Sequence, residues 1–366
     1  MASQTPRGGS RRLALIGSSA SLLLRARGGL MRAAADRGCR MLALAPEIDS
    51  DQSAAFEALG VELRTLPVAP AYSLLAGRSA LASLRDILTA WNAHTVLANG
   101  VSIAPSAVAA ARVANVPHVA VLAGDLPERG VSRRLGSALA AADTIIVHNE
   151  MDGRVVRAAL GGKAPGIVRI PGSGANLDMA AGIAMPAASD ALIFLAVMRL
   201  DRIKGVHDYL DAARIAKSQG LKAEFLLAGP AGTQAGAATT ETLARYASAV
   251  RYLGDLEQPG PAIRKAHVAV VPSHREGMPH VALTALAASR PLVVTDIPGA
   301  RETVDDMING TLAAPNDPAG LAAAFARLDA HRDLLANMAL ASRRKAERLF
   351  DAEAVNAQLM QALKLH

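Results

Sequence analysis

Short runs of apolar residues alternate with longer helix-like stretches along nearly the whole chain, and this alternation restricts the fold more than any other feature. The runs are continuous and do not alternate with polar residues, which is typical of parallel strands that helices cover on both faces. The pattern therefore predicts a βα repeat of the Rossmann type. In the first half the runs lie at 13–17, 41–45, 96–98, 118–123 and 144–147.

A second series of apolar runs predicts a second unit of the same class. Two units suit a chain of 366 residues, which exceeds the size at which one hydrophobic core usually stops growing. Residues 180–190 are rich in small residues, contain a proline and lack periodicity, so we place the junction there. The class is α/β with parallel sheets, and the expected domains are 1–185 and 186–348, followed by 349–366. The runs of the second series lie at 192–197, 224–228, 250–253, 268–271 and 291–295.

One cysteine and the absence of a long apolar stretch indicate a protein of the reducing cytoplasm. Cys39 has no second Cys for a disulfide and no His or Cys at a metal-ligand spacing. Each apolar run is interrupted before it reaches the roughly 18–20 residues that span a bilayer. Arg11-Arg12 mimics a twin-arginine export signal, but Arg25 and Arg27 interrupt the apolar region that follows and 13–17 is needed as the first strand.

The chain is basic, with a net charge of +7, and its first half carries two arginine clusters. A solvated surface is the simplest interpretation. The alternative is attraction to anionic lipid headgroups or to a pyrophosphate-bearing molecule, and so peripheral contact with the inner face of a membrane. With aromatic residues at 3% and no recognisable binding module, we expect no nucleic acid partner. The clusters are Arg7, Arg11, Arg12, Arg25, Arg27 and Arg32, and then Arg129, Arg133 and Arg134.

The first candidate site follows the strand predicted at 192–197. Arg199 and Lys204 lie in the turn that leads into a helix predicted over 209–216. Two cations beside a helix N-terminus can stabilise the negative charge of a departing diphosphate without a metal. An ordinary pair of loop cations is an equally good interpretation of this segment alone.

The second candidate site follows the strand predicted at 268–271. A small polar loop, Pro272 to Gly277, leads to a helix that we expect to begin near Pro279, with the proline at its first helical position. Gly277 allows close approach of the backbone to a ligand. Glu276 can accept hydrogen bonds from sugar hydroxyls, while backbone N–H groups of the turn face a phosphate.

Together these segments resemble the family-four retaining glycosyltransferases. That family has the GT-B architecture of two facing Rossmann-like domains, and its C-terminal segment, here 350–365, forms a helix that crosses back to the first domain. The resemblance covers most of the chain, because the matching motifs occur in the family's order. They are Gly229-Pro230, Tyr252-Leu253-Gly254, residues 272–279, residues 298–302 and Asn309-Gly310.

The resemblance implies roles for individual residues. Arg199 and Lys204 would bind the donor diphosphate and Glu276 the transferred sugar, with no metal, no cofactor and no dedicated base. The donor would be a nucleotide sugar, with UDP as its nucleotide, and the leaving phosphate would draw the acceptor proton on the same face. The residues implied to line the donor site are Gly277, Met278, Pro279, His280, Val281, Thr284, Gly229, Ser173 and Gly174.

A narrower likeness concerns the first half. Arg27-Gly28-Gly29-Leu30, residues 149–152 and residues 171–178 are similar to the subgroup that extends undecaprenyl-diphosphate-linked sugars. This implies a lipid-linked or other glycan acceptor near Arg27, Gly28, Gly29 and Asn149. Many relatives carry a histidine in the segment that corresponds to 123–126, where this chain has none. We interpret His118, at the beginning of that strand, as structural.

One position departs from the family pattern. The family has a second acid eight residues after the first, where it binds the nucleotide ribose, and this chain has Thr284 there. The shorter side chain predicts weaker donor binding and leaves open a catalytically inactive relative that acts as a binding subunit. A nucleotide-sugar epimerase and a phosphorylase or synthase with a soluble acceptor are further alternatives within the fold.

Two other motifs point to no chemistry. Asp49-Ser50-Asp51 imitates a metal-binding pair of acids, but nothing else in the chain accompanies that motif. Gly161-Gly162-Lys163 lacks the preceding glycine of a phosphate-binding loop.

Overall fold

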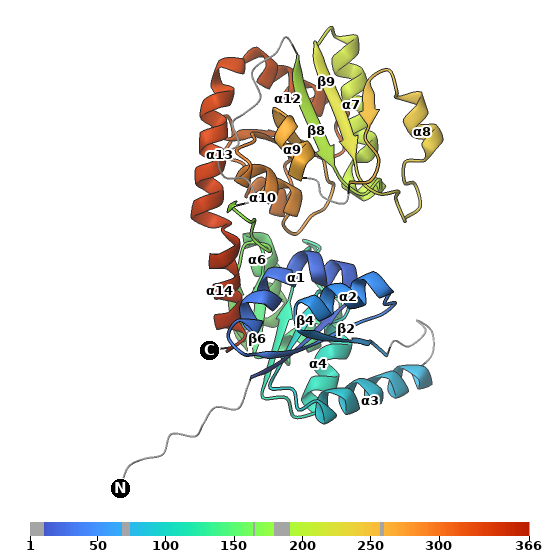
Figure 1. The fold of residues 1–366 in the computed structure, drawn as a ribbon, viewed down its shortest axis with the longest axis vertical. Coiled ribbons are helices and arrows are strands. Elements are labelled where there is room, and N and C mark those ends of the chain that lie inside the picture. The colour runs from blue at the N-terminus through green and yellow to red at the C-terminus, as the bar shows by residue number, and fades with distance from the viewer. Residues whose placement is uncertain (1–10, 68–73, 164, 179–190, 257–259, 366) are drawn as a thin grey trace. The chain divides into compact units, whose positions relative to one another are not determined.

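The structure, a computed structural model, describes residues 11–67, 74–163, 165–178, 191–256 and 260–365 (Figure 1). The chain forms two compact units, one of residues 1–173 with 353–366 and one of residues 174–352. The junction predicted at 180–190 lies outside the described residues. Each unit is a parallel sheet covered by helices, in agreement with the α/β class expected from the apolar runs.

The first unit contains a seven-stranded parallel sheet in the order β3-β2-β1-β4-β5-β6-β7. Alternate residues of its strands enter two different cores, because successive side chains point to opposite faces. Leu13 and Leu15 join the helices α1, α2 and α14, whereas Ala14 and Ile16 join α3, α4, α5 and α6. The strands are β1 Arg12–Gly17, β2 Arg40–Ala45, β3 Val61–Thr65, β4 Thr95–Asn99, β5 His118–Leu122, β6 Thr144–Val147 and β7 Gly166–Arg169.

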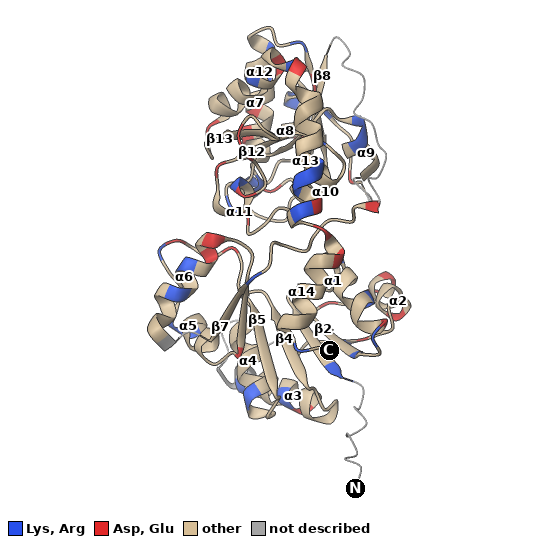
Figure 2. Cartoon of the chain, turned by 90° about the vertical axis from the view of Figure 1, so that its left-hand side faces the viewer, with Lys and Arg blue, Asp and Glu red and all other residues tan. Residues whose placement is uncertain are grey.

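The helices α1 to α6 connect the parallel strands of this unit. The strands themselves carry few charged side chains, which gather on the helices and loops (Figure 2). The final helix α14 belongs to this unit although it follows the second unit in sequence. The helices are α1 Ala20–Ala35, α2 Ser50–Ala58, α3 Leu74–Ala90, α4 Ala104–Val113, α5 Arg133–Ala140, α6 Glu150–Leu160, the short 3-10 helix η1 Gly161–Lys163 and α14 Ala352–Ala362.

The second unit contains a six-stranded parallel sheet in the order β10-β9-β8-β11-β12-β13. One face packs against α7 and α12 around a cluster of rings that includes Phe194, Phe225 and Phe325. The other face packs against α9, α10 and α11. The strands are β8 Leu192–Val197, β9 Ala223–Ala228, β10 Val250–Tyr252, β11 Val268–Val271, β12 Leu292–Thr295 and β13 Gly310–Ala313.

The helices of the second unit follow the strands in the same βα order. The helix predicted at 209–216 is longer than expected and begins three residues earlier, at Val206. The helices are η3 Arg202–Lys204, α7 Val206–Ser218, α8 Thr240–Arg245, α9 Gly260–Lys265, α10 His280–Ala287, α11 Pro298–Arg301, α12 Pro318–Ala330, η4 Arg332–Leu334 and α13 Leu335–Leu349.

Three strands escaped the sequence prediction. β3 and β13 lie at the edges of their sheets, and β7 is the edge strand at the other end of the first sheet. β3 and β7 are largely exposed, so their residues are polar at several positions and do not form a continuous apolar run. β13 contains only four residues and begins with a glycine.

Candidate functional site

Most of the candidate donor residues lie in loops at the carboxyl ends of neighbouring strands of the second unit. β9, β8, β11 and β12 are adjacent in the sheet, and each leads into a loop that carries predicted residues. In parallel α/β sheets, ligands bind at this edge. The loops are Gly229 onwards after β9, 198–205 after β8, 272–279 after β11 and 296–299 after β12.

Lys204 and Glu276 form an ion pair although they are far apart in the sequence. Their Nζ and Oε2 atoms lie 2.5 Å apart, and their side chains are 28% and 18% exposed. The η3 turn supplies the lysine and the loop after β11 the glutamate. The two charges therefore neutralise each other in a position that solvent can reach.

Arg199 points to a different partner. Its Nε donates to the fully buried carboxylate of Asp201, which also accepts the backbone N–H groups of Thr233 and Gln234. Burial alone would raise the pKa of Asp201, but these three donors outweigh it and hold the pKa below its ordinary value. No hydrogen bond or ion pair within the described residues links Arg199 to Lys204 or Glu276. The terminal nitrogens of Arg199, which is partly exposed, have no protein partner there.

The loop after β11 is attached to the turn after β8 by two further contacts. The backbone N–H of His274 donates to the carbonyl of Ile203 at 2.9 Å. The Nε2 of His274 lies 2.7 Å from a carboxylate oxygen of Asp208, in the first turn of α7. On the other side, the hydroxyl of Thr295 donates to the carbonyl of Ser273. These contacts fix the relative positions of the two loops that carry Lys204 and Glu276.

Two glycines make this close packing possible. Gly205 has φ 75°, and a Cβ there would lie 1.8 Å from the carbonyl oxygen of Pro272. A Cβ on Gly299 would lie 1.9 Å from the carbonyl oxygen of Gly277. No side chain fits at either position, so the turns at 205 and 299 support the loop that carries Glu276.

The remaining residues of the second candidate segment lie at the beginning of α10. Pro279 is the N-cap residue and not the first helical residue, so the predicted helix start was wrong by one position. No side chain caps this helix. The hydroxyl of Thr284 donates to the carbonyl of His280 at 3.0 Å. Gly277, Met278 and Val281 are half-buried, and His280 is exposed.

Gly229 begins the first of these loops, and two further predicted donor residues, Ser173 and Gly174, lie outside them. Gly229 follows β9, and its carbonyl accepts the hydroxyl of Tyr252 at 2.7 Å. Ser173 is the last residue of the first unit before the chain enters the second. Gly174 packs against the backbone of Ala352, where the chain returns, and a Cβ would lie 2.5 Å from the Cα of Ala352.

The predicted acceptor residues belong to the first unit. Arg27, Gly28 and Gly29 lie within α1, and Gly29 leaves room for the side chain of Asn356 of α14. Arg27 is buried, and its Nε donates to the Oδ1 of Asn99 at 2.8 Å. Asn149 is a buried N-cap of α6 whose Oδ1 accepts the backbone N–H of Asp152 at 2.8 Å. Its side chain therefore caps the helix.

Several other residues that the sequence singled out have structural contacts. His118 is buried, and its Nε2 lies 3.1 Å from the carbonyl oxygen of Ala362. Asp49 caps α2 by accepting the backbone N–H of Gln52 at 2.7 Å. Burial raises the pKa of the Cys39 thiol despite the nearby charges of Arg11 and Arg37, which disfavours the reactive thiolate. Within the described residues, no group of three or more His, Cys, Asp or Glu side chains could hold a metal ion.

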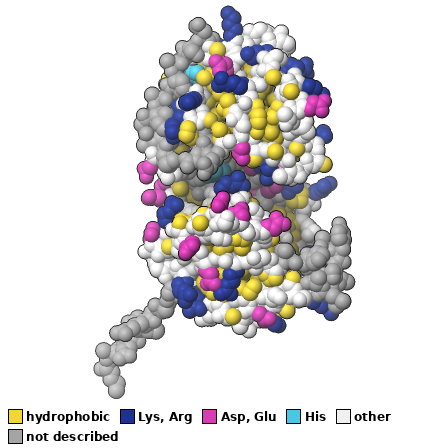
Figure 3. Space-filling model, turned by 45° about the vertical axis from the view of Figure 1, so that its right-hand side comes forward, with side chains coloured by type: hydrophobic (Ala, Val, Ile, Leu, Met, Phe, Trp, Pro, Cys, Tyr) yellow, Lys and Arg dark blue, Asp and Glu magenta, His cyan; other side chains and the backbone are white. Residues whose placement is uncertain are grey.

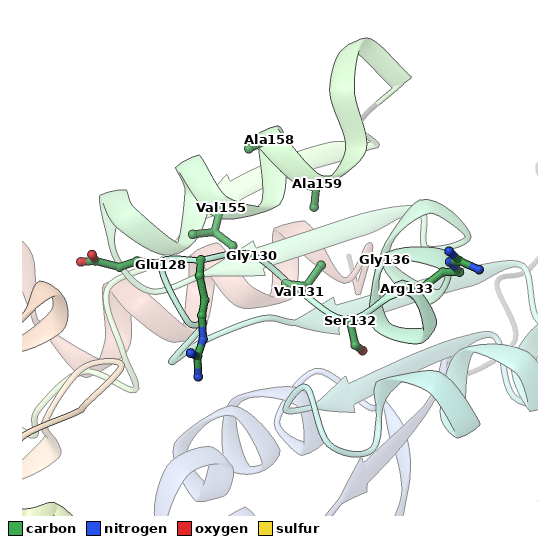
Figure 4. Close-up of a pocket in the computed structure, with 10 residues that line it drawn as sticks. Glu128, Gly130, Val131, Ser132, Arg133, Gly136, Val155, Ala158 and Ala159 are labelled. Carbon is green, nitrogen blue, oxygen red and sulfur yellow. The ribbon is translucent and has the colours of Figure 1, made fainter.

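A separate hollow of about 470 Å³ lies in the first unit between α6 and the segment 128–136, which comprises a loop and the beginning of α5 (Figure 4). Val131 faces the apolar residues Val155, Ala158 and Ala159 across it. The charged ends of Glu128 and Arg133 point away from its centre. The hollow contains none of the predicted site residues and no converging polar groups, so it is a poor candidate for a substrate site.

Comparison with known families covers both units. Residues 25–173 match the family described as "Glycosyl transferase 4-like domain", and residues 190–331 match "Glycosyl transferases group 1". The two matches support a family-four glycosyltransferase. The narrower likeness to enzymes of undecaprenyl-linked sugars has no counterpart in these matches.

Individual relatives agree with this family. A D-inositol 3-phosphate glycosyltransferase from Geodermatophilus obscurus is 31% identical over 243 residues, which are 61% of this chain and 54% of that protein. A glycogen synthase from Mycobacterium tuberculosis is 36% identical over 152 residues, which are 41% of this chain and 35% of that protein. The chain thus matches about half or less of the length of these two glycosyltransferase relatives.

Solved structures show the same GT-B fold. HepE from Anabaena, in complex with UDP and glucose, matches with a TM-score of 0.77 at 18% identity over 97% of this chain and 100% of that chain. The GT-B class predicted from the motifs is therefore confirmed. No helix in the described part of the chain is long and apolar enough to cross a membrane.

Two features of the site were missed by the sequence analysis. Asp201 was not predicted as the partner of Arg199, although a carboxylate two residues after the arginine was a visible signal. The pair of His274 and Asp208 was also missed, because it joins two loops that are distant in sequence. The first contact had a signal in the local sequence, whereas the second had none.

Proposed function

We propose that this chain is a retaining, metal-independent hexosyltransferase that uses a nucleoside diphosphate sugar, with UDP as the nucleotide. The observation that carries the proposal is the ion pair of Lys204 and Glu276 at the carboxyl edge of the second sheet, where Lys204 shares the turn after β8 with Arg199. The complex of HepE with UDP and glucose supports a UDP-sugar donor, because the two proteins share a fold.

In this proposal the pair separates when the donor binds. Lys204 turns to the diphosphate, and the free terminal nitrogens of Arg199 bind the same anion while Asp201 holds its Nε. Glu276 then accepts hydrogen bonds from the hydroxyls of the transferred sugar. Both cations stabilise the charge that grows on the leaving diphosphate, which is the largest electrostatic change in the reaction. The leaving phosphate takes the proton of the acceptor hydroxyl.

The acceptor in this proposal is a lipid-linked or surface-glycan precursor at the inner face of a membrane. The basic composition supports contact with anionic lipid. On the face drawn in Figure 3, basic and acidic side chains are interspersed. Arg129, Arg133 and Arg134 form one exposed group in the first unit.

The deciding experiment is a donor panel. Purified protein is incubated with radiolabelled UDP-, GDP- and ADP-sugars, each with a total lipid extract or with soluble sugars as acceptor. Transfer of label from a UDP-sugar to lipid supports the proposal. Transfer only to a soluble sugar would reassign the acceptor, and release of a changed sugar without an acceptor would indicate an epimerase. If no label is transferred or released with any donor, the proposed enzymatic function is wrong.

Thr284 favours one competing function, an inactive relative that binds nucleotide weakly. Its hydroxyl donates to the carbonyl of His280 and thus to its own helix. We expect Thr284→Glu to tighten UDP binding about tenfold, because one or two hydrogen bonds to a carboxylate contribute about 1.5 kcal/mol or more. Calorimetric titration measures the change, with Thr284→Gln as a neutral control. An unchanged affinity would remove the ribose contact assigned to this position.

A further inference from the structure

Arg27 carries a buried charge that no acid among the described residues offsets. The side chain is 2% exposed, and burial lowers its pKa to about 10, so it remains charged at neutral pH. Within the described residues it forms no ion pair. Removing an ion from water costs several kcal/mol unless an opposite charge compensates for it. A bound anion would supply the opposite charge that the described residues do not.

The guanidinium also has unused hydrogen-bond donors. Nε donates to the Oδ1 of Asn99 at 2.8 Å, and Nη1 donates to the carbonyl of Ala26 at 3.2 Å. Nη2 has no partner among the described residues. A buried guanidinium normally uses its fork of donors fully, and two parallel N–H groups fit an oxyanion.

The surroundings of Arg27 form the ligand-binding edge of the first sheet. Asn99 is the last residue of β4, Gly124 lies just beyond β5, and His148 follows β6 directly. These three strands are neighbours, so their carboxyl ends lie side by side. Arg27 reaches this edge from α1 and contacts it through Asn99.

His148 adds a second unused polar atom at the same edge. Its Nδ1 lies 2.9 Å from the carbonyl oxygen of Ile170 and 3.2 Å from the backbone nitrogen of Gly172, so this nitrogen is engaged. Nε2 has no partner among the described residues. Burial and the charge of Arg27 lower the pKa of His148 to about 4, which keeps the ring neutral at pH 7. A Cβ on Gly124 would lie 3.1 Å from the Cδ2 of His148, so the glycine leaves space beside the ring.

We infer that Arg27 binds a phosphate-type oxyanion of a substrate at this edge of the first unit, with the Nε2 of His148 beside it. The anion supplies the missing negative charge, and the Nη2 group supplies the hydrogen bonds. This inference adds an anion site to the proposed function. It depends on that function only where it assigns the anion to a substrate. The anion belongs either to a phosphorylated acceptor or to the diphosphate of the donor.

The test uses the full-length protein and inorganic phosphate as the probe. Thermal unfolding and calorimetry are measured with increasing phosphate, with and without saturating UDP. Ligand that binds only the native state raises Tm in proportion to the logarithm of its concentration. The variants are Arg27→Gln, Arg27→Lys and, as a matched loss of charge on the same helix, the exposed Arg25→Gln.

The expected result is a phosphate-dependent rise in Tm for the wild type and Arg25→Gln. Arg27→Gln should lose it, with a dissociation constant at least tenfold higher, and Arg27→Lys should retain part of it. Without phosphate, Arg27→Gln should be as stable as the wild type or more stable, since an uncompensated buried charge has been removed. A purely structural arginine would instead make Arg27→Gln less stable at every phosphate concentration and equally responsive to phosphate, which would overturn the inference.

The two sources of the anion give different outcomes. If the Arg27-dependent effect persists in saturating UDP, the anion is that of an acceptor; if UDP abolishes it, the anion is the diphosphate of the donor. Failure of UDP to bind in the titration without phosphate would count against the proposed function and not against the anion site. An absence of any phosphate effect that depends on Arg27 would count against the site alone.

Discussion

In the proposed reaction Lys204 binds the diphosphate and Glu276 binds the transferred sugar. Mutating one residue at a time should therefore affect nucleotide binding and sugar transfer differently. We expect Lys204→Gln to weaken UDP binding by about 10- to 100-fold, because charge-assisted hydrogen bonds to the phosphates are lost. Glu276→Gln should leave UDP binding unchanged or up to about tenfold tighter, since Lys204 loses its competing partner. The same variant should lower the rate of sugar transfer at least about 100-fold.

Calorimetry with UDP and a transfer assay measure these effects. Lys217→Gln, an exposed lysine near the end of α7, is the control for loss of charge. Equal losses of UDP affinity in both site variants would contradict the assignment of Glu276 to the sugar.

Two neighbouring residues of the first unit titrate in opposite senses. Burial raises the pKa of Asp152 to about 6, despite hydrogen bonds from Leu126, Asp125 and Asn149, so its contribution to stability is lost as the pH rises through 6. The pKa of His148 is lowered to about 4, so its contribution is lost as the pH falls from its ordinary value of 6.5 towards 4. In the wild type the two contributions largely cancel between pH 4 and 6.5.

When either group is removed by mutation, the pH dependence of stability due to the other group should become measurable. Relative to the wild type, Asp152→Asn should lose up to about 3 kcal/mol of stability as the pH falls from 6.5 to 4, and His148→Gln should gain a similar amount. Urea unfolding of the first unit, followed by hydrogen exchange across this pH range, measures both slopes. Parallel pH profiles for the two variants and the wild type would exclude the opposed titration.

At the scale of elements, the site depends on how two loops touch. The turn after β8 and the loop after β11 meet at Gly205, where the carbonyl of Pro272 occupies the space of a side chain. We expect Gly205→Ala to lower the free energy of unfolding of the second unit by about 2–4 kcal/mol, through overlap and a strained φ. It should also weaken UDP binding, since Lys204 and His274 shift with the turn.

Gly220→Ala distinguishes the effect of steric overlap from that of a strained φ. Gly220 has φ 87° in the same unit, but a Cβ there would meet nothing within 4 Å. This control should lose only the strain component, about 1 kcal/mol, and retain UDP affinity. Chemical denaturation and calorimetry compare the pair. Similar losses in both variants would mean that the contact with Pro272 is unimportant.

At the scale of the whole molecule, the chain passes between the two units twice, after Ser173 and after Ala352. Its last helix, α14, completes a core of the first unit. Val355, Leu359 and Leu363 are buried with residues of α1, and the carbonyl of Leu363 accepts the hydroxyl of Thr95 at 3.2 Å. The stability of the first unit therefore depends on a segment that follows the second unit in sequence.

We expect Leu359→Ala to lower the free energy of unfolding of the first unit by about 2–5 kcal/mol, the usual cost of a cavity in a core. Hydrogen exchange should accelerate in residues 11–163 and remain unchanged in 191–349. Gln358→Ala, exposed on the same helix, is the matched control. Equal acceleration in both units would show that they unfold together.

The sequence by itself determined the class of the fold and the positions of most strands along the chain, because buried parallel strands need continuous apolar runs whatever surrounds them. Glycines and charged loop residues after those strands also marked the edge where ligands bind. Edge strands such as β3 and β7 could not be found in this way, since most of their residues are exposed and do not form a continuous apolar run.

Tertiary structure alone decided which charges meet. Lys204 pairs with a glutamate 72 residues away, Arg199 turns to Asp201, and Arg27 is buried without an acid. Such partnerships depend on which loops the sheet order brings side by side and on how deeply each side chain is desolvated. The local sequence shows neither which loops are neighbours nor how deeply a side chain is buried. The charge pairs of the site therefore depend on the strand order of the sheet as well as on the motifs.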